Sequence, residues 1–143
     1  MNDSRNIMNE EINKIVIPEL RKIGFSGSFP HFRRINNSEI HLLTFQFDKY
    51  GGGFIIEIAK AQNKPFKTYW GKVIEQNKLT AHDLNERIRI HPKGILKDSS
   101  TDDWFRYDKV GIFRRNVYNN VAKQVIGKLN LIEKCFIDEL ICE

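Results

Sequence analysis

The sequence predicts an α+β fold, in which an antiparallel β-meander of about four strands is packed on one face by an N-terminal helix and a long C-terminal helix. Apolar residues recur every three or four positions near both ends of the chain, and they form short, partly alternating runs between these ends. Short connections join the first three runs, so neighbouring strands must be antiparallel. Because no linker, repeat or low-complexity tract interrupts this pattern, residues 1–143 are expected to form a single domain.

The N-terminal helix is indicated by apolar residues whose spacing keeps them on one helical face. These residues are Ile7, Met8, Ile12, Ile15, Val16, Leu20 and Ile23. Gly24 is expected to end the helix. Pro18 lacks a backbone N–H and crowds the carbonyl of Lys14, which predicts a kink or an early end near Ile17.

Four runs in the middle of the chain are predicted to be strands because they are rich in branched and aromatic residues and are bounded by turn residues. They are Phe32–Ile35, Glu39–Lys49, Phe54–Ala59 and Arg87–Ile90. Asn36–Ser38 is expected to form one turn, and Gly51–Gly53 permits the positive φ of a second tight connection. Residues 60 to 85 are less regular, with a helical fragment expected around Val73 to Leu79.

The C-terminal helix is the clearest predicted element. Its apolar positions recur every three or four residues: Val117, Val121, Val125, Leu129, Ile132, Phe136 and Leu140. Gly127 is expected to interrupt it mildly. Both helices are then expected to cover the same face of the sheet.

The turn after the first strand determines which side chains share a face. If Asn37-Ser38 is a two-residue turn, Arg34 pairs with His41 and Phe32 pairs with Leu43. Alternation then places one apolar set on the core face: Phe32, Leu43, Phe45, Phe47, Phe54, Ile56 and Ile58. A one-residue slip in the turn would reverse the assignments of the first strand.

The opposite face is expected to carry polar side chains. These are His31, Arg33, Thr44, Gln46 and Glu57, and Arg87 and Arg89 have the parity to join them. One interpretation is an ordinary solvated sheet face. The other is a recognition surface in which arginines bind a carboxylate or phosphate and Glu57 orients them. The candidate ligand-binding residues are therefore Arg33, Gln46, Glu57, Arg87 and Arg89.

Composition and cysteine usage exclude several classes. Lys plus Arg is 23 and Asp plus Glu is 18, which gives a net charge of +5. This charge excludes an acidic protein that mimics a binding partner, but it does not establish a nucleic-acid binder. No apolar run reaches the roughly 20 residues of a membrane span, and the N-terminus has no apolar signal core. Cys135 and Cys142 lie two helical turns apart, beyond disulfide reach, which favours the cytoplasm.

Motifs that would support catalysis or metal binding are missing from the sequence. The four histidines, His31, His41, His82 and His91, form no compact ligand motif. Gly51–Gly53 precedes a strand rather than the helix that follows a phosphate-binding loop. There is no nucleophile elbow and no Cys-x-x-Cys pair. We therefore expect no metal, no cofactor and no catalytic residue. The sequence does not decide whether the protein is an enzyme, but it favours a protein without catalytic activity.

Two alternatives remain open. A nucleic-acid-binding module is suggested by lysines interleaved with aromatic residues, namely Lys60, Lys64, Phe66, Lys67, Tyr69, Trp70 and Lys72. Aromatic residues in an irregular segment more often anchor it to the core. The other alternative is an enzyme that acts on a phosphate-bearing substrate through Arg33, Arg89 and Glu57.

Several short motifs occur in an order that resembles a bacterial family, the domain of unknown function 4304. They are Leu20–Phe25, Phe32–Arg34, Leu43–Phe47, Phe54–Ile58, Arg87–Ile90 and Asp103–Phe105. The resemblance covers roughly residues 8 to 107 and implies the helix-plus-meander fold. The glycine that commonly follows the Arg-Leu pair in this family is missing here, which leaves the register of the fourth strand open. The resemblance implies no activity and no catalytic residues.

Together these patterns favour a cytoplasmic bacterial protein that binds a protein partner or a small anionic ligand without catalysis. Small bacterial α+β proteins sometimes act as inhibitors in toxin–immunity systems, so immunity protein-like inhibition is one version of this hypothesis, by analogy. Nucleic acid is the less favoured partner, and no membrane is expected.

Overall fold

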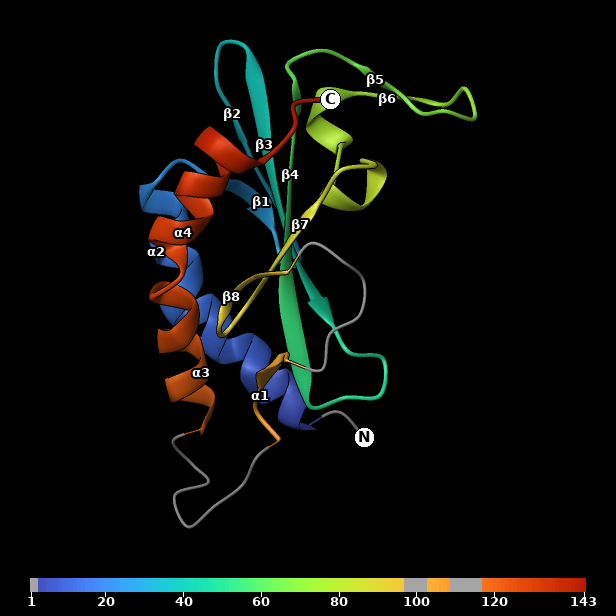
Figure 1. Ribbon diagram of the computed structural model, residues 1–143. Helices are drawn as coiled ribbons and strands as arrows, with labels where there is room; N and C mark the ends of the chain where they lie inside the picture. The colour runs from blue at the N-terminus through green and yellow to red at the C-terminus, as the bar shows by residue number, and fades with distance from the viewer. Residues whose placement is uncertain (1–2, 97–102, 109–116) are drawn as a thin grey trace.

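Helices cover one face of an antiparallel sheet, and among the described residues the other face carries short turns and a small hairpin (Figure 1). The computed structural model describes residues 3–96, 103–108 and 117–143. Its α+β architecture, with an N-terminal and a C-terminal helix on one sheet face, confirms the predicted fold class.

The N-terminal helix comprises α1 (Asp3–Glu11), the π-helical segment η1 (Ile12–Val16) and α2 (Ile17–Lys22). The predicted early end near Ile17 was wrong, because helical backbone continues through Pro18. The wider π-turn lies directly before this proline, which then occupies the start of α2, where a missing N–H is tolerated. Gly24 ends the helix with a φ of 98°, as predicted.

The C-terminal helix comprises α3 (Val117–Ile126), α4 (Leu129–Lys134) and the π-helical segment η5 (Cys135–Glu139). The predicted interruption at Gly127 is confirmed by the break between α3 and α4.

The described residues form a seven-stranded sheet with the order β1-β2-β3-β4-β7-β8, and β9 pairs with one end of β4. The strands are β1 (Ser26–Ser28), β2 (His31–Ile35), β3 (Glu39–Phe47), β4 (Gly53–Gln62), β7 (Ile88–His91), β8 (Gly94–Leu96) and β9 (Phe105–Arg106). The four predicted strands correspond to β2, β3, β4 and β7. The strands β1, β8 and β9 have only two or three residues, too few for an alternation signal.

The segment between β4 and β7 differs from the prediction. A separate hairpin contains β5 (Phe66–Lys67) and β6 (Val73–Ile74), so the expected helical fragment begins instead as a strand. Two 3₁₀ turns follow, η2 (Gln76–Lys78) and η3 (Ala81–Asp83).

The register of the sheet confirms the predicted turn. Phe32 pairs with Leu43 and Arg34 with His41. On the other side of β4, Glu57 pairs with Arg89, which settles the open register of the fourth strand.

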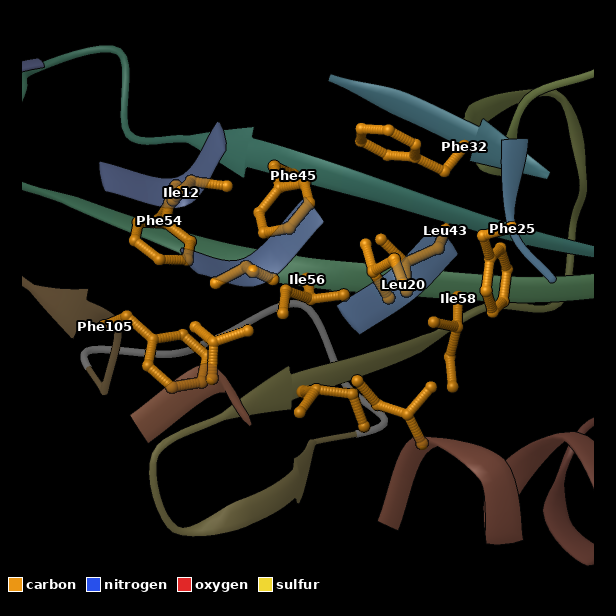
Figure 2. Packing of buried hydrophobic residues seen from close by; sticks show 14 of the residues in the cluster. Ile12, Leu20, Phe25, Phe32, Leu43, Phe45, Phe54, Ile56, Ile58 and Phe105 are labelled. Atoms are coloured by element: carbon orange, nitrogen blue, oxygen red, sulfur yellow. The ribbon is translucent and has the colours of Figure 1, made fainter. Parts of the chain in front are cut away.

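The main core lies between the helices and the sheet, where aromatic and aliphatic side chains from both layers meet (Figure 2). The predicted core-face residues all belong to it or pack against it: Phe32, Leu43, Phe45, Phe47, Phe54, Ile56 and Ile58. Ile12 and Leu20 of the N-terminal helix, Phe25, and Phe105 of β9 also belong to this core and are labelled in Figure 2.

A second, smaller core lies on the opposite face of the sheet. It contains Ile40, Leu42, Ala59, Ala61, Leu79, Ala81 and Leu84. The fully solvated face that one interpretation expected was therefore wrong for this half of the sheet. The strands β3 and β4 present apolar side chains on both faces here, and residues 75–84 cover those on the second face. We call residues 75–84 the cover segment.

Candidate functional site

A line of polar residues crosses the helix-free face of the sheet beside the second core. Four of them are cross-strand neighbours, because His31 pairs with Thr44, Thr44 with Glu57, and Glu57 with Arg89. Three more side chains lie against this line. We call the seven residues the polar row: His31, Thr44, Gln46, Glu57, His82, Arg87 and Arg89.

Glu57 lies at the centre of the polar row and is only 1% exposed. His82 Nε2 lies 3.0 Å from Oε1 of Glu57, and Arg89 Nε donates to Oε2 at 2.9 Å. With its amide nitrogen turned toward the carboxylate, Gln46 donates to both oxygens at 3.0 and 3.2 Å. The buried carboxylate is thus satisfied by donors from β3, β7 and the cover segment, as a buried charge requires.

Arg87 adds a second guanidinium near the same carboxylate. Its Nε lies 3.9 Å from Oε2 of Glu57, and its Nη1 donates to the backbone oxygen of His82 at 3.2 Å. Burial opposes ionisation of Glu57, but the hydrogen bonds from His82 and Arg89 and the charges of the two arginines outweigh it. The pKa of Glu57 therefore lies below its ordinary value.

Two imidazoles meet at the edge of the polar row. His31 Nδ1 lies 2.9 Å from Oγ1 of the fully buried Thr44, and the rings of His31 and His82 are perpendicular, with centroids 5.6 Å apart. Burial lowers the pKa of His31, and the charges of His82 and Arg33 lower it further. His31 is therefore mainly neutral at pH 7.

The cover segment places His82 over Glu57. Thr80 and Asp83 form a reciprocal cap of η3, in which the N–H of Thr80 donates to Oδ2 of Asp83 at 2.9 Å and the N–H of Asp83 donates to the Thr80 side chain. The buried residues Ala81 and Leu84 anchor the same turn in the second core. This turn holds the imidazole of His82 at the buried carboxylate.

Four of the five predicted site residues come together: Gln46, Glu57, Arg87 and Arg89. Arg33 shares their face, which confirms its predicted parity, but its Nη2 donates to the backbone oxygen of Leu79 at 3.0 Å. Its Nε is buried without a hydrogen-bond partner among the described residues. Arg33 therefore supports the cover segment and is not among the described partners of Glu57.

Sequence reasoning missed the role of His82. It lies 25 positions after Glu57 in a short 3₁₀ turn, and no periodicity links the two residues. The only local signal is the cap formed by Thr80 and Asp83, which predicts the turn without indicating what its histidine contacts.

The lysine and aromatic residues from Lys60 to Lys72 divide into two groups. Lys60, in β4, is buried and its Nζ donates to the backbone oxygen of Phe136 at 2.6 Å, so it joins the sheet to the C-terminal helix. Phe66 packs against the second core, as expected of an anchoring aromatic residue, but Tyr69 and Trp70 are exposed and do not anchor their segment.

The remaining chemical features are few. Cys135 is buried, as predicted, and neither it nor Cys142 is in a disulfide. Within residues 3–96, 103–108 and 117–143, no cluster of three or more His, Cys, Asp or Glu residues could hold a metal ion. Over the same ranges, no helix has the length and apolar character that crossing a membrane requires.

The family model described as Domain of unknown function (DUF4304) matches residues 16–131. This chain belongs to the DUF4304 family. The matched region contains the whole polar row, the cover segment and the β5–β6 hairpin. No curated protein and no solved structure matches the chain.

Proposed function

We propose that this DUF4304 protein is a non-catalytic binding domain whose polar row recognises an anionic group, a carboxylate or a phosphate, on a protein or small-molecule partner. The observation that carries the proposal is the buried Glu57, which holds cationic side chains from different elements in one place at the surface of the sheet.

Charge within the polar row favours an anion. The row has one carboxylate, two guanidinium groups and two imidazoles. Arg87, Arg89 and His82 are each partly exposed while they contact Glu57. A buried carboxylate that fixes guanidinium groups lowers the entropy cost of binding, and planar guanidinium groups match the geometry of carboxylate and phosphate oxygens.

The arrangement supports binding rather than nucleophilic catalysis. Thr44 carries the only hydroxyl of the polar row, and it is fully buried and in contact with His31. The alternative enzyme hypothesis needs Arg33 beside Glu57, and Arg33 instead contacts Leu79.

The proposed setting is the bacterial cytoplasm. Its support is the pair of free cysteines, which suits a reducing compartment, and the resemblance of the sequence motifs to a bacterial family.

The proposal is tested by titrating the ¹⁵N-labelled protein with inorganic phosphate and with a short acidic peptide while recording amide shifts. We expect saturable shifts centred on the polar row. Arg87→Gln should weaken binding about tenfold, because a hydrogen bond to a charged group is lost. Arg5→Gln is the matched control: Arg5 is an exposed residue of α1 whose guanidinium lies over the Phe47 ring on the helix-covered side of the sheet, and its loss should leave anion binding unchanged. Shifts spread evenly over the basic surface, or equal affinities for the two variants, would reject the proposal.

A further inference from the structure

The β5–β6 hairpin projects from the end of the sheet, away from the helices, and we call residues 63–74 the arm (Figure 1). Its base is fixed, because Phe66 and Ile74 pack against the second core. Its tip is a closed turn: the N–H of Gly71 donates to the Thr68 carbonyl at 3.0 Å, and the N–H of Thr68 donates to the Lys72 carbonyl at 2.8 Å.

Two aromatic side chains occupy the central positions of this turn. Tyr69 is 86% exposed and Trp70 is 61% exposed. Their rings are perpendicular, with centroids 4.9 Å apart. Gly71 has a φ of 93°, a conformation that glycine adopts without strain, and the buried Thr68 hydroxyl accepts from the N–H of Lys72 at 2.9 Å. The turn thus presents two large rings to solvent in a defined conformation, and neither ring contributes to the core.

The charged residues close to the two rings in the sequence are all lysines. Residues 58–74 contain four lysines and no Asp or Glu. Lys60 is buried, but Lys64, Lys67 and Lys72 are exposed. Hollows of about 360 and 520 Å³ flank the base of the arm, the first lined in part by Lys64 and Lys67 and the second by Lys72.

Three carboxylates also line these hollows, Glu143 in the first and Glu75 and Asp83 in the second, where Lys78 adds a further positive charge. Glu143 accepts hydrogen bonds from the N–H groups of Asn85 and Glu86, and Asp83 accepts from Thr80. Two of the three carboxylates therefore already have donors within the domain.

We propose that the arm binds single-stranded nucleic acid, with bases stacked on Tyr69 and Trp70 and phosphates neutralised by Lys64, Lys67 and Lys72. Exposed aromatic faces beside a positively charged path are the features with which proteins bind single strands without reading sequence. A membrane anchor is less well matched, because the tip from Thr68 to Lys72 contains no aliphatic side chain. An acidic protein would satisfy the lysines but gives no reason for two perpendicular rings.

The test measures fluorescence anisotropy of a labelled oligothymidylate of about 12 nucleotides, a length that spans a typical single-strand site. We expect binding at low salt. The logarithm of the association constant should fall linearly with the logarithm of salt concentration, with a slope of about −2 for three lysines. Trp70→Ala should weaken binding about tenfold or more, and Trp70→Phe should restore most of it, because phenylalanine keeps a stacking face.

Matched controls separate the arm from general basic attraction. Tyr50 is 85% exposed beside Lys49 in the turn between β3 and β4, so Tyr50→Ala removes an equally exposed aromatic residue elsewhere. The triple variant with Lys64, Lys67 and Lys72 changed to glutamine should lose binding. The same change at three exposed helix lysines should not: Lys14, Lys123 and Lys134.

Four results would overturn the proposal. They are no oligonucleotide binding at low salt, equal losses for the arm and control variants, polyglutamate binding that Trp70→Ala weakens as much as it weakens oligothymidylate binding, and binding confined to vesicles containing phosphatidylserine. The variants change exposed side chains, and circular dichroism checks that each remains folded. The polar-row variant Arg87→Gln should bind oligothymidylate normally, so failure of this inference and failure of the proposed anion site are distinguishable.

Discussion

At the scale of single residues, the burial of Glu57 is the least expected feature of the molecule. It lies in the centre of β4, where its neighbours Ile56 and Ile58 are fully buried. An apolar residue of similar size would often be as stable there, since desolvation of a buried ion pair offsets much of its attraction. We infer that this carboxylate is retained because it orients His82, Arg87 and Arg89.

Glu57→Ala should lower the free energy of unfolding by about 3 kcal/mol, because it leaves partly buried cations without their partner. Glu57→Gln should cost less, since the amide oxygen still accepts a hydrogen bond from Arg89. Equilibrium urea denaturation measures both values. The exposed Lys134→Ala variant is the control and should stay within about 0.5 kcal/mol of the wild type. A loss below about 1 kcal/mol for Glu57→Ala would contradict this account.

The two histidines of the polar row should be coupled electrostatically. The pKa of His31 lies below its ordinary value of 6.5 because of burial and the charges of His82 and Arg33. His82→Gln removes one repelling charge, so the pKa of His31 should rise. The imidazole C–H resonance of His31 followed against pH measures the change. His41 lies on the opposite face and should be unaffected, and an unchanged His31 midpoint would disprove the coupling.

At the scale of elements, sequence patterns predicted those that are long and one-sided. The two helical segments and the strands β2, β3, β4 and β7 each contain enough periodic residues to show which face is buried. Short elements held by their neighbours were missed. The strand β1 has only Ser26, Gly27 and Ser28, a composition typical of a loop, and it is a strand because it pairs with β2.

That pairing makes Gly27 a sensitive position. It has a φ of 109°, and a methyl group added there would lie 2.7 Å from the backbone oxygen of His31. Gly27→Ala should cost about 3 kcal/mol, from unfavourable backbone conformation together with the clash. Gly51 has a φ of 90° but nothing within 4 Å of the added methyl group, so Gly51→Ala should cost only about 1 kcal/mol. Equal melting temperatures for the two variants would show that the contact in β1 is not important.

At the scale of the whole molecule, the candidate site was predictable only as far as the sheet register was. A two-residue turn at Asn37-Ser38 is enough to place Arg33, Gln46 and Glu57 on one face, because the side chains alternate between the faces along β2, β3 and β4. The contacts of the cover segment could not be predicted from this alternation. Its side chains reach the face by tertiary packing, which brought His82 to Glu57 and held Arg33 at Leu79.

Titratable groups with shifted pKa values lie on both faces of the sheet, so the free energy of unfolding depends on pH. The pKa of Glu57 is lowered despite burial by hydrogen bonds and nearby arginines, and that of Glu39, on the rim of the other face, is lowered by a hydrogen bond from His41. Burial lowers the pKa values of His31 and His41. For all four groups the unfolded chain binds protons more readily than the folded chain. Each group therefore contributes stability that is lost as the pH falls.

We expect the free energy of unfolding to fall in two stages on acidification. The first begins near pH 6.5 as histidines of the unfolded chain take up protons, and the second begins near pH 4.5 with the carboxylates. On the alkaline side, burial raises the pKa values of Cys142 and Tyr107, so stability should also fall above about pH 9. Urea midpoints across this range measure the profile, and Glu57→Gln should weaken the second stage and leave the first in place. Stability that is constant or rises between pH 7 and pH 4 would show that these buried groups do not govern the acid response of the fold.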